Sequence, residues 1–337
     1  MGSLLLSIVG LAIAALAPRP AMAESKQLRI ATLAPSGSPW MQLLEGAALE
    51  IAERTDKRVT IKYFAGGQQG DERDYVRKIK LGQLDGAALT AMGLAQIEPS
   101  ILVLQMPMLF ATLDEVDHVA TKMWPYFQNK FEAKGFRLGE RGEVGWIYLF
   151  SKAKVTTLAE LRQQKLPLLG TDELGTSVSR KLGLDGIPLS IPEIGPALTS
   201  GRINACFSSP LGAIALQWHT KVRFMTSMPM VYAIGATVFS LEAVKAVSAE
   251  DQKTLAAVAK HSQKKARAVI RRTNADAQKT LLRKGIAVVA PSKEMVDELT
   301  ALAVEAQTAL AGKLYSTEEL EMAIRYRDEL RAKRANK

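Results

Sequence analysis

The sequence has very little cysteine and histidine, and this limits the chemistry that it can support. Its single cysteine, Cys206, excludes an intrachain disulfide and any metal site built from several thiolates. Cys206 ends an expected strand, where cysteine is more often a small buried apolar side chain than a nucleophile. The three histidines, His118, His219 and His261, are scattered over expected helices without the spacing of metal ligands. We therefore expect no bound metal.

Motifs of common enzyme classes are also missing. The chain has no Gly-x-Gly-x-x-Gly fingerprint, no Walker phosphate loop and no Gly-x-Ser-x-Gly elbow. The glycine-rich run 66–70 lacks the lysine of a phosphate loop. Asp71 and Glu72 are adjacent on an expected helix, so their carboxylates diverge. The sequence therefore predicts a protein that is not an enzyme, with no catalytic residues and no cofactor.

Acidic residues are outnumbered by basic ones, which gives a net charge of +10 at pH 7. A basic chain raises the question of nucleic acid binding. The basic clusters at 264–272, 283–284 and 331–337 contain no aromatic residue on which a base could stack. A solvated helix face accounts for this charge, and we expect no nucleic acid partner.

Only the N-terminus contains a long uninterrupted apolar run, Leu4 to Ala17, which is followed by Ala21-Met22-Ala23. The run is too short to span a bilayer comfortably, which takes about 20 residues. It fits the core of a secretory signal with an Ala-x-Ala cleavage site, although no Lys or Arg precedes it. We predict a Sec-type signal peptide at 1–23, and an exported mature chain from about Glu24 that does not itself span a membrane.

The remaining chain alternates between strand and helix patterns. Strands are expected at 28–32, 58–64 and 84–89, separated by helices that begin at Ser38 and Asp71. Strands separated by helices imply parallel pairing in a doubly wound α/β sheet.

A second passage of the same kind follows. Its expected strands are 166–169, 187–190 and 203–207, with helices at 175–182 and 192–200 between them. The other expected elements are a helical segment 112–134 broken at Pro125, strands 137–151, 230–241 and 285–290, and helices 249–283, 293–312 and from Ser316.

Two stretches resemble one another and close the two passages. They are KLGQLDGAALTAMG, Lys80 to Gly93, and LTSGRINACFSSPLG, Leu198 to Gly212. Each has a helix end, a glycine, a short strand and a turn rich in Ser or Thr. Two similar α/β lobes in one chain create a cleft between them, which is a common place for a small molecule to bind.

Six segments also follow one another in a recognisable order. They are LRIATLAPSGSPW, VTIKYFAGGQQGDERDYVRKIKLGQLDGA, MPMLFATLDEVDHV, LAELRQQKLPLLGT, GIPLSIPEIGPALTSGRINA and SSPLGAIALQWHTKV. This order resembles the DctP-type solute receptors of TRAP transporters, over about Lys26 to Ala311. The resemblance implies a periplasmic receptor that closes around a small-molecule ligand and hands it to a membrane permease.

The resemblance also implies the two-lobe periplasmic binding protein fold. Each lobe has a doubly wound sheet with flanking helices, and crossing strands form the hinge. Lobe I is expected to comprise 24–146 and about 231–270. Lobe II is expected to comprise 147–230 and about 271–337, which includes long bracing C-terminal helices. We expect the hinge in the strands near 146–151 and 231–240.

The chain departs from this family where acid-binding members grip a carboxylate. The resemblance places an arginine at the position of Pro167, and a second in the segment that here is 145–150, which has no charge. Ser208-Ser209-Pro210 stands where Glu-Asn-Pro is common. Removing one partner of a buried ion pair typically costs about 3–5 kcal/mol. We therefore predict a neutral or largely apolar ligand, in a branch that lacks the usual arginine.

The residues expected to contact this ligand lie at strand ends, turns and helix starts that face the cleft. They are Trp40, Gln68, Met92, Trp146, Tyr148, Pro167, Thr171, Phe207, Ser208, Ser209, Trp218 and Tyr232. Trp218 is expected on the helix that follows Pro210. Packing within a lobe remains an alternative role for Trp40 and Trp218, and a plain turn for Gln68. Two alternatives for function also remain: an organic carboxylate held by Arg73, Arg141 or Arg180, or an exported enzyme on the same fold.

Overall fold

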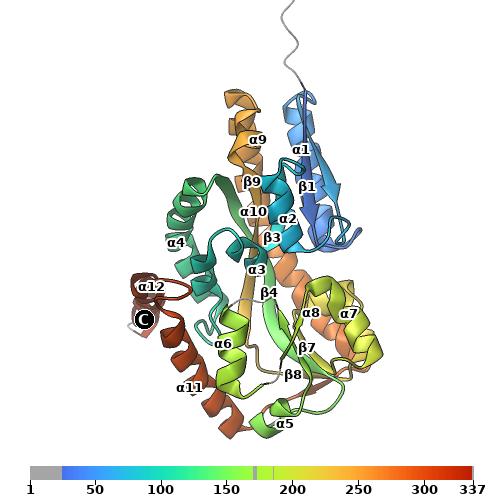
Figure 1. Cartoon of the computed structure of the whole chain (residues 1–337), viewed down its shortest axis with the longest axis vertical. Helices are drawn as coiled ribbons and strands as arrows, with labels where there is room; N and C mark the ends of the chain where they lie inside the picture. Colours follow the sequence, from blue (N-terminus) through green and yellow to red (C-terminus); the bar gives the residue numbers. More distant parts are fainter. Residues whose placement is uncertain (1–24, 170–172, 185, 336–337) are drawn as a thin grey trace, which may run out of the picture.

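The computed structural model describes residues 25–169, 173–184 and 186–335. The predicted signal peptide, 1–23, lies outside these residues. The described chain forms two lobes stacked along the long axis of the molecule (Figure 1). None of its described helices is long and apolar enough to cross a membrane.

Lobe I begins with three parallel strands, as the strand–helix alternation predicts. They are β1 (Lys26–Thr32), β2 (Val59–Phe64) and β3 (Gly86–Thr90), connected through α1 (Pro39–Arg54) and α2 (Glu72–Lys80). Ser38 caps α1, because its hydroxyl accepts the Met41 N–H. Asp71 caps α2 in a reciprocal capping box with Asp74.

Two long strands extend this sheet and join it to lobe II. β9 (Val231–Ser240) pairs antiparallel with β3 on one side and with β4 (Phe136–Ser151) on the other. The last residues of β4, from Tyr148 onward, pair instead with β7 (Ala205–Ser208) and β8 (Phe224–Thr226). The two lobes therefore share one eight-stranded sheet, in the order β10-β8-β4-β9-β3-β1-β2 with β7 paired to β4.

The rest of lobe II consists of short alternating elements. They are α5 (Leu158–Arg162), β5 (Leu166–Leu169), α6 (Glu173–Leu182), β6 (Gly186–Leu189), α7 (Ile191–Ser200), α8 (Pro210–Ala215) and the 3₁₀ helix η2 (Trp218–Lys221). β5 and β6 form a separate parallel two-stranded sheet. The expected α/β class with two lobes is confirmed.

Two expectations about helices are wrong. Pro125 does not break the helical segment, since α4 (Leu113–Ala133) is continuous through it. The buried side chains of Trp124 and Phe127 flank the proline, and their packing holds the helix in spite of its missing N–H. Trp218 does not lie on the helix that follows Pro210. Gln217 adopts a left-handed φ of 58°, which separates α8 from η2.

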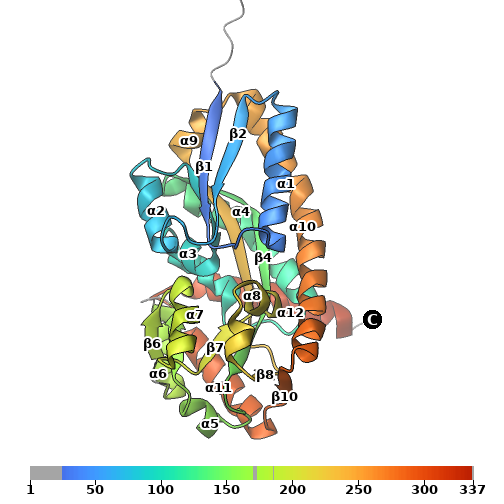
Figure 2. The same cartoon turned by 90° about the vertical axis from the view of Figure 1, so that its right-hand side faces the viewer.

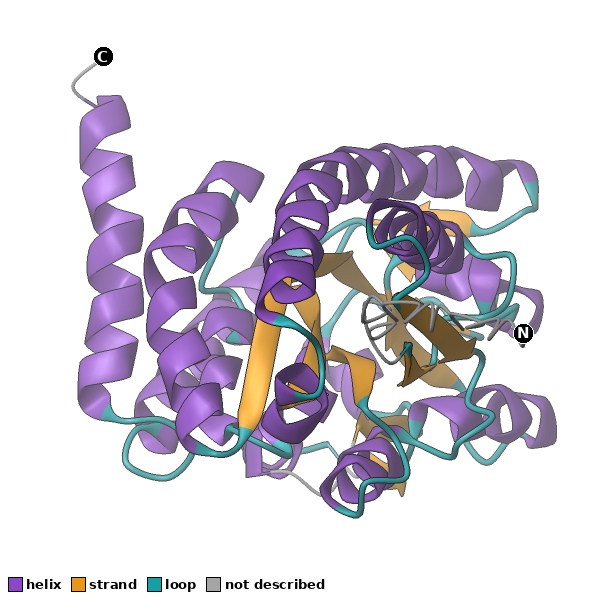
Figure 3. Cartoon of the chain, turned by 90° about the horizontal axis from the view of Figure 1, so that it is seen from above, coloured by secondary structure: helices purple, strands orange, loops and turns teal. Residues whose placement is uncertain are grey.

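Long helices cover the sheet from the C-terminal part of the chain (Figures 2 and 3). α10 (Ala249–Arg283) packs on α1 and β4 of lobe I and on α8 of lobe II. α12 (Thr317–Ala335) packs on α4 and on the 3₁₀ helix η1 (Pro99–Gln105). Ser316 and Glu319 form the predicted capping box at its start. The remaining elements are α3 (Ala91–Ala95), α9 (Leu241–Lys245), β10 (Ala287–Val289) and α11 (Lys293–Leu310).

Candidate functional site

A cavity of about 730 Å³ lies between the lobes and continues into lobe I. Its lobe I wall is built at the carboxyl ends of β1 and β3, where Thr32, Thr90 and Met92 line it. Carboxyl ends of parallel strands are the usual place for ligand contacts in α/β sheets. The lobe II wall includes Pro167 at β5 and Phe207 at β7.

Trp40 is held firmly at the edge of this cavity. It stands in the first turn of α1, and its indole Nε1 donates a 3.0 Å hydrogen bond to the carbonyl oxygen of Glu143 on β4. This bond links the start of α1 to the strand that passes between the lobes. The polar end of the indole is therefore satisfied by the protein, and its ring forms part of the wall.

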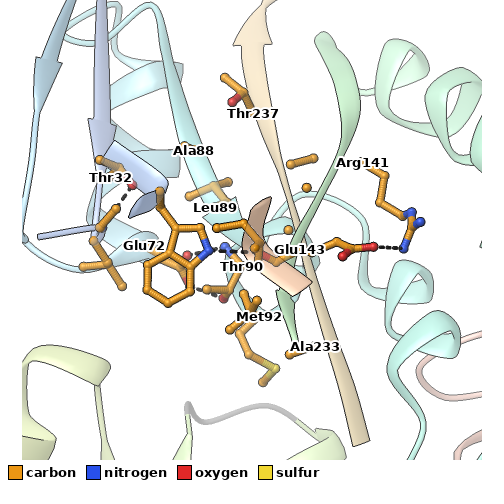
Figure 4. Close-up of a pocket in the computed structure, with 18 of the residues that line it drawn as sticks. Thr32, Glu72, Ala88, Leu89, Thr90, Met92, Arg141, Glu143, Ala233 and Thr237 are labelled. Atoms are coloured by element: carbon orange, nitrogen blue, oxygen red, sulfur yellow. Dashed lines mark hydrogen bonds and ion pairs between the residues drawn. The ribbon is translucent and has the colours of Figure 1, made fainter. Parts of the chain in front are cut away.

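Like Glu143 of β4, Glu72 is a buried carboxyl of the lobe I wall (Figure 4). Its Oε1 accepts the Thr90 N–H at 2.6 Å and its Oε2 accepts the Thr90 hydroxyl at 2.7 Å. Burial raises the pKa of Glu72 to about 7, although the Thr90 hydrogen bonds oppose the shift. A Cβ at Gly93 would stand 2.8 Å from the carboxyl carbon, so glycine makes this close approach possible.

Two adjacent serines of the lobe II wall, Ser208 and Ser209, differ in their hydrogen bonding. The Ser209 hydroxyl accepts the Gly212 N–H at 3.0 Å and so caps α8. The Ser208 hydroxyl makes no hydrogen bond to another residue of the described chain, although Ser208 is 6% exposed and lines the cavity. Of these two hydroxyls, that of Ser208 is therefore the one that is free to bond to a ligand.

Every arginine that lines the cavity already has a carboxylate partner. Arg137 pairs with Glu132, and Arg267 lies 3.6–3.7 Å from Asp117 and Glu143. The Arg141 Nη2 donates to Asp117 Oδ1 at 2.6 Å, and its Nη1 lies 3.3 Å from Glu143 Oε1.

The pairs of Arg141 and Arg267 belong to one network beside β4. Arg271 of α10 bridges the same two acids, Asp117 and Glu143, at 2.7 Å each. Hydrogen bonding to Arg271 and the charge of Arg141 lower the pKa of Asp117 against the effect of burial. Figure 4 shows the Arg141 side chain across β4 from Glu72 and Thr90. The other two arginines considered for a carboxylate, Arg73 and Arg180, are exposed and lie outside the cavity wall.

The structure brings most of the predicted contact residues to the cavity. Those in its wall are Trp40, Met92, Pro167, Phe207, Ser208, Ser209 and Trp218. Thr171 lies outside the described residues. Gln68 is exposed in the turn after β2 and does not line the cavity.

Three predicted aromatic residues point away from the cavity. The Trp146 and Tyr232 rings pack edge to face, with centroids 5.0 Å apart, and Tyr232 belongs to the lobe I core. Tyr148 packs against the lobe II core. Successive side chains of a strand alternate between faces, and Ile147 is the residue of this stretch that reaches the cavity.

Sequence reasoning missed several residues of the lobe I wall. Thr32 and Thr90 each end a predicted parallel strand, so the strand-end rule could have identified them. The sequence places Glu72 only beside Asp71 at the start of a helix and gives no sign that it lines a cavity. Its pairing with Thr90 depends on how α2 packs beside β3, which the local pattern does not show.

Comparison with known proteins agrees with this architecture. The profile of the DctP family, described as bacterial extracellular solute-binding protein family 7, matches residues 30–310. The uncharacterized protein YiiZ of Salmonella typhimurium is 26% identical over 58% of this chain. A solute-binding protein of Roseobacter denitrificans is 24% identical over 57% of it. These alignments span 60% and 59% of the relatives' own lengths.

Solved structures resemble the chain over most of its length. A sugar acid binding protein from Advenella mimigardefordensis, in complex with galactonate, superposes with a TM-score of 0.86 at 19% identity, covering 91% of this chain and 99% of that one. A TRAP periplasmic solute binding protein from Xanthobacter autotrophicus with bound β-D-galacturonate gives 0.83 at 18%, covering 90% and 99%. A Bordetella pertussis receptor binding pyroglutamic acid gives 0.84 at 15%, covering 90% and 100%.

Proposed function

Since this chain belongs to family 7 of the bacterial extracellular solute-binding proteins, the DctP family, we propose that it is the periplasmic receptor of a TRAP-type transporter. It captures a small, neutral or largely apolar ligand in the interlobe cavity and delivers that ligand to a membrane permease. Binding favours the closed arrangement of the lobes, since the ligand contacts both of them.

The proposed ligand class rests on the residues that form the lobe II wall of the cavity, opposite Glu72. Pro167 and Phe207 provide apolar surface there, and the three arginines that line other parts of the cavity, Arg137, Arg141 and Arg267, each lie within 4 Å of a carboxylate. Each of these guanidinium groups already has an acidic neighbour, although Arg267 makes no hydrogen bond to it, and a bound carboxylate would also lie near the Glu72 carboxyl. A neutral ligand avoids both costs, and each buried CH₂ contributes about 0.8 kcal/mol.

An organic acid is the alternative ligand, and the similar structures favour it because they hold galactonate, galacturonate and pyroglutamic acid. An acid would have to recruit Arg73, Arg141 or Arg180. Arg141 would first have to give up part of its contact with Asp117 and Glu143.

An exported enzyme is the second alternative, and chemical conversion of a bound ligand on incubation would support it.

Calorimetric titration separates the two ligand classes. We expect the unmodified protein to bind neutral apolar compounds more tightly than galactonate or succinate. Pro167→Arg restores a guanidinium to the wall, so we expect it to gain galactonate affinity by at least tenfold and to lose affinity for neutral ligands.

Lys165→Arg is the matched control for this titration, since Lys165 is exposed beside the same strand and lies outside the cavity wall. It is expected to change neither affinity. Tight galactonate binding by the unmodified protein, together with no binding of neutral compounds, would refute the proposed ligand class.

A further inference from the structure

The cavity does not end at the interlobe cleft. It continues into lobe I between one face of the sheet and the helices α1 and α10. We call this part the inner chamber and define it by Leu44 and Ala47 of α1, Tyr63 of β2, Phe239 of β9, and Leu255 and Ala259 of α10. Trp40 and Leu44 are one helical turn apart on α1, so the wall runs without interruption from the cleft into the chamber.

The exposure of neighbouring residues shows that this layer is loosely packed. Val238 faces the lobe I core and is 0% exposed. The next residue, Phe239, faces α1 and α10 and is only half-buried, as are Tyr63 and Leu255. Side chains between a sheet and two covering helices are ordinarily close-packed. Here they leave space that a molecule in the cleft can reach.

Small side chains contribute to this space. Ala47 of α1 and Ala259 of α10 both line the chamber. Neither side chain extends beyond a methyl group, so neither fills the gap between the helices and the sheet. The six residues that define the chamber carry no charged group, so their surface suits hydrocarbon rather than an ion.

We propose that the inner chamber takes the hydrocarbon chain of an amphipathic ligand. The neutral polar end of that ligand, a hydroxyl or an amide, stays in the cleft within reach of the Ser208 hydroxyl. This inference rests on the proposed function, because it assumes a neutral ligand in the cleft. It adds that affinity is set by the length of an apolar chain that enters lobe I.

A homologous series of straight-chain primary alcohols, from butan-1-ol to decan-1-ol, tests the inference by calorimetry. Each added CH₂ is expected to raise the affinity of the unmodified protein about fourfold. Ala259→Phe fills the chamber, so the longer alcohols are expected to lose this gain while butan-1-ol binds as before.

Ala268→Phe is the matched control, because Ala268 is exposed on the same helix and lies outside the cavity wall. It should keep the full dependence on chain length. Leu44→Trp fills the chamber from the opposite wall and serves as a second variant if Ala259→Phe does not fold.

The outcomes separate this inference from the proposed function. If short neutral alcohols bind but affinity does not rise with chain length, or if both filling variants keep the rise, the chamber takes no chain and the inference fails alone. If no alcohol binds and galactonate does, the proposed ligand class fails and the inference fails with it.

Discussion

At the scale of single residues, Glu72 is the group whose charge most directly affects the cavity. Its carboxyl is buried, it is held by two hydrogen bonds from Thr90, and no cation of the described chain pairs with it. Such a carboxyl is more stable protonated, because burial disfavours the ion. The protonation state of Glu72 therefore links pH both to stability and to ligand affinity.

We predict that the unmodified protein loses stability relative to Glu72→Gln as the pH rises. The pKa of Glu72 in the folded protein, about 7, lies above its ordinary value of 4.5, so the folded state holds the proton more tightly. Its stabilising effect is complete below about pH 4.5 and is lost as the pH passes 7. Denaturant unfolding should show a relative loss of about 2–3 kcal/mol between about pH 5 and pH 8.

The control for this measurement is Glu321→Gln, which changes an exposed glutamate on α12 and should follow the unmodified protein. Binding of a neutral ligand should weaken over the same pH range in the unmodified protein but not in Glu72→Gln. A stability difference independent of pH would show that Glu72 stays ionised in the folded protein.

At the scale of elements, β4 is one of the two strands that join the lobes, and Gly145 is the position where its backbone is irregular. Gly145 has a φ of +116°, and the pairing of β4 with β9 shifts register between Glu143 and Gly145. Asn274 of α10 stabilises this point from the side. Its Nδ2 donates to the Val144 carbonyl oxygen at 2.9 Å, and its Oδ1 accepts the Leu211 N–H of α8 at 3.1 Å.

Gly145→Ala is expected to destabilise the protein. A Cβ at this position would lie 2.7 Å from Asn274 Nδ2, on a backbone conformation that alanine rarely adopts. Strain of this kind costs about 1–3 kcal/mol, and the displaced Asn274 would release its bonds to β4 and α8. The measurement is the midpoint of urea unfolding together with ligand affinity.

Gly46→Ala makes the same chemical change on α1, where a Cβ meets nothing within 4 Å. It should be neutral or stabilising by up to about 1 kcal/mol, because alanine favours a helix. Equal effects of the two substitutions would contradict a special role for Gly145.

At the scale of the whole molecule, the connections between the lobes determine how the lobes can move relative to one another. The described lobes are joined by β4 and β9. The helix α10 lies along both lobes, since it packs on α1 of lobe I and on α8 of lobe II. We propose that the lobes, 24–146 with about 231–270 and 147–230 with about 271–337, rotate about the strand segments near 146–151 and 231–240. The packing of α12 on α4 places the last helix beside lobe I elements, where it can brace the molecule during this motion.

Closure on a bound ligand should make the molecule more compact. Small-angle X-ray scattering is expected to show a smaller radius of gyration when a tightly bound neutral ligand is added, because both walls of the cleft contact it. A compound that does not bind serves as the control and should leave the scattering curve unchanged. An unchanged radius with saturating ligand would argue against closure by rotation of the lobes.

The sequence by itself determined the parts of this protein that depend on local interactions. The helix caps at Ser38, Asp71 and Ser316 can be predicted from the sequence, because a capping hydrogen bond joins residues only a few positions apart. The strand–helix alternation predicted the α/β class, and the strand ends predicted Phe207 and Ser208 at the cavity wall, where the structure places them. Their contact with a ligand remains a prediction.

Only the tertiary structure decided features that depend on residues distant in the sequence. The face of β4 that reaches the cavity is that of Ile147 rather than Trp146, because pairing with β9 and a register shift orient the strand. Arg141 has two acidic neighbours because the fold brings Asp117 of α4 beside Glu143 of its own strand, and Arg271 of α10 shares both acids. The inner chamber lies where α1 and α10 pack together over the lobe I sheet, and the sequences of these two helices do not show that they are neighbours. Each of these features depends on packing between segments that are distant in the sequence. The local pattern of one segment does not show which other segments pack against it.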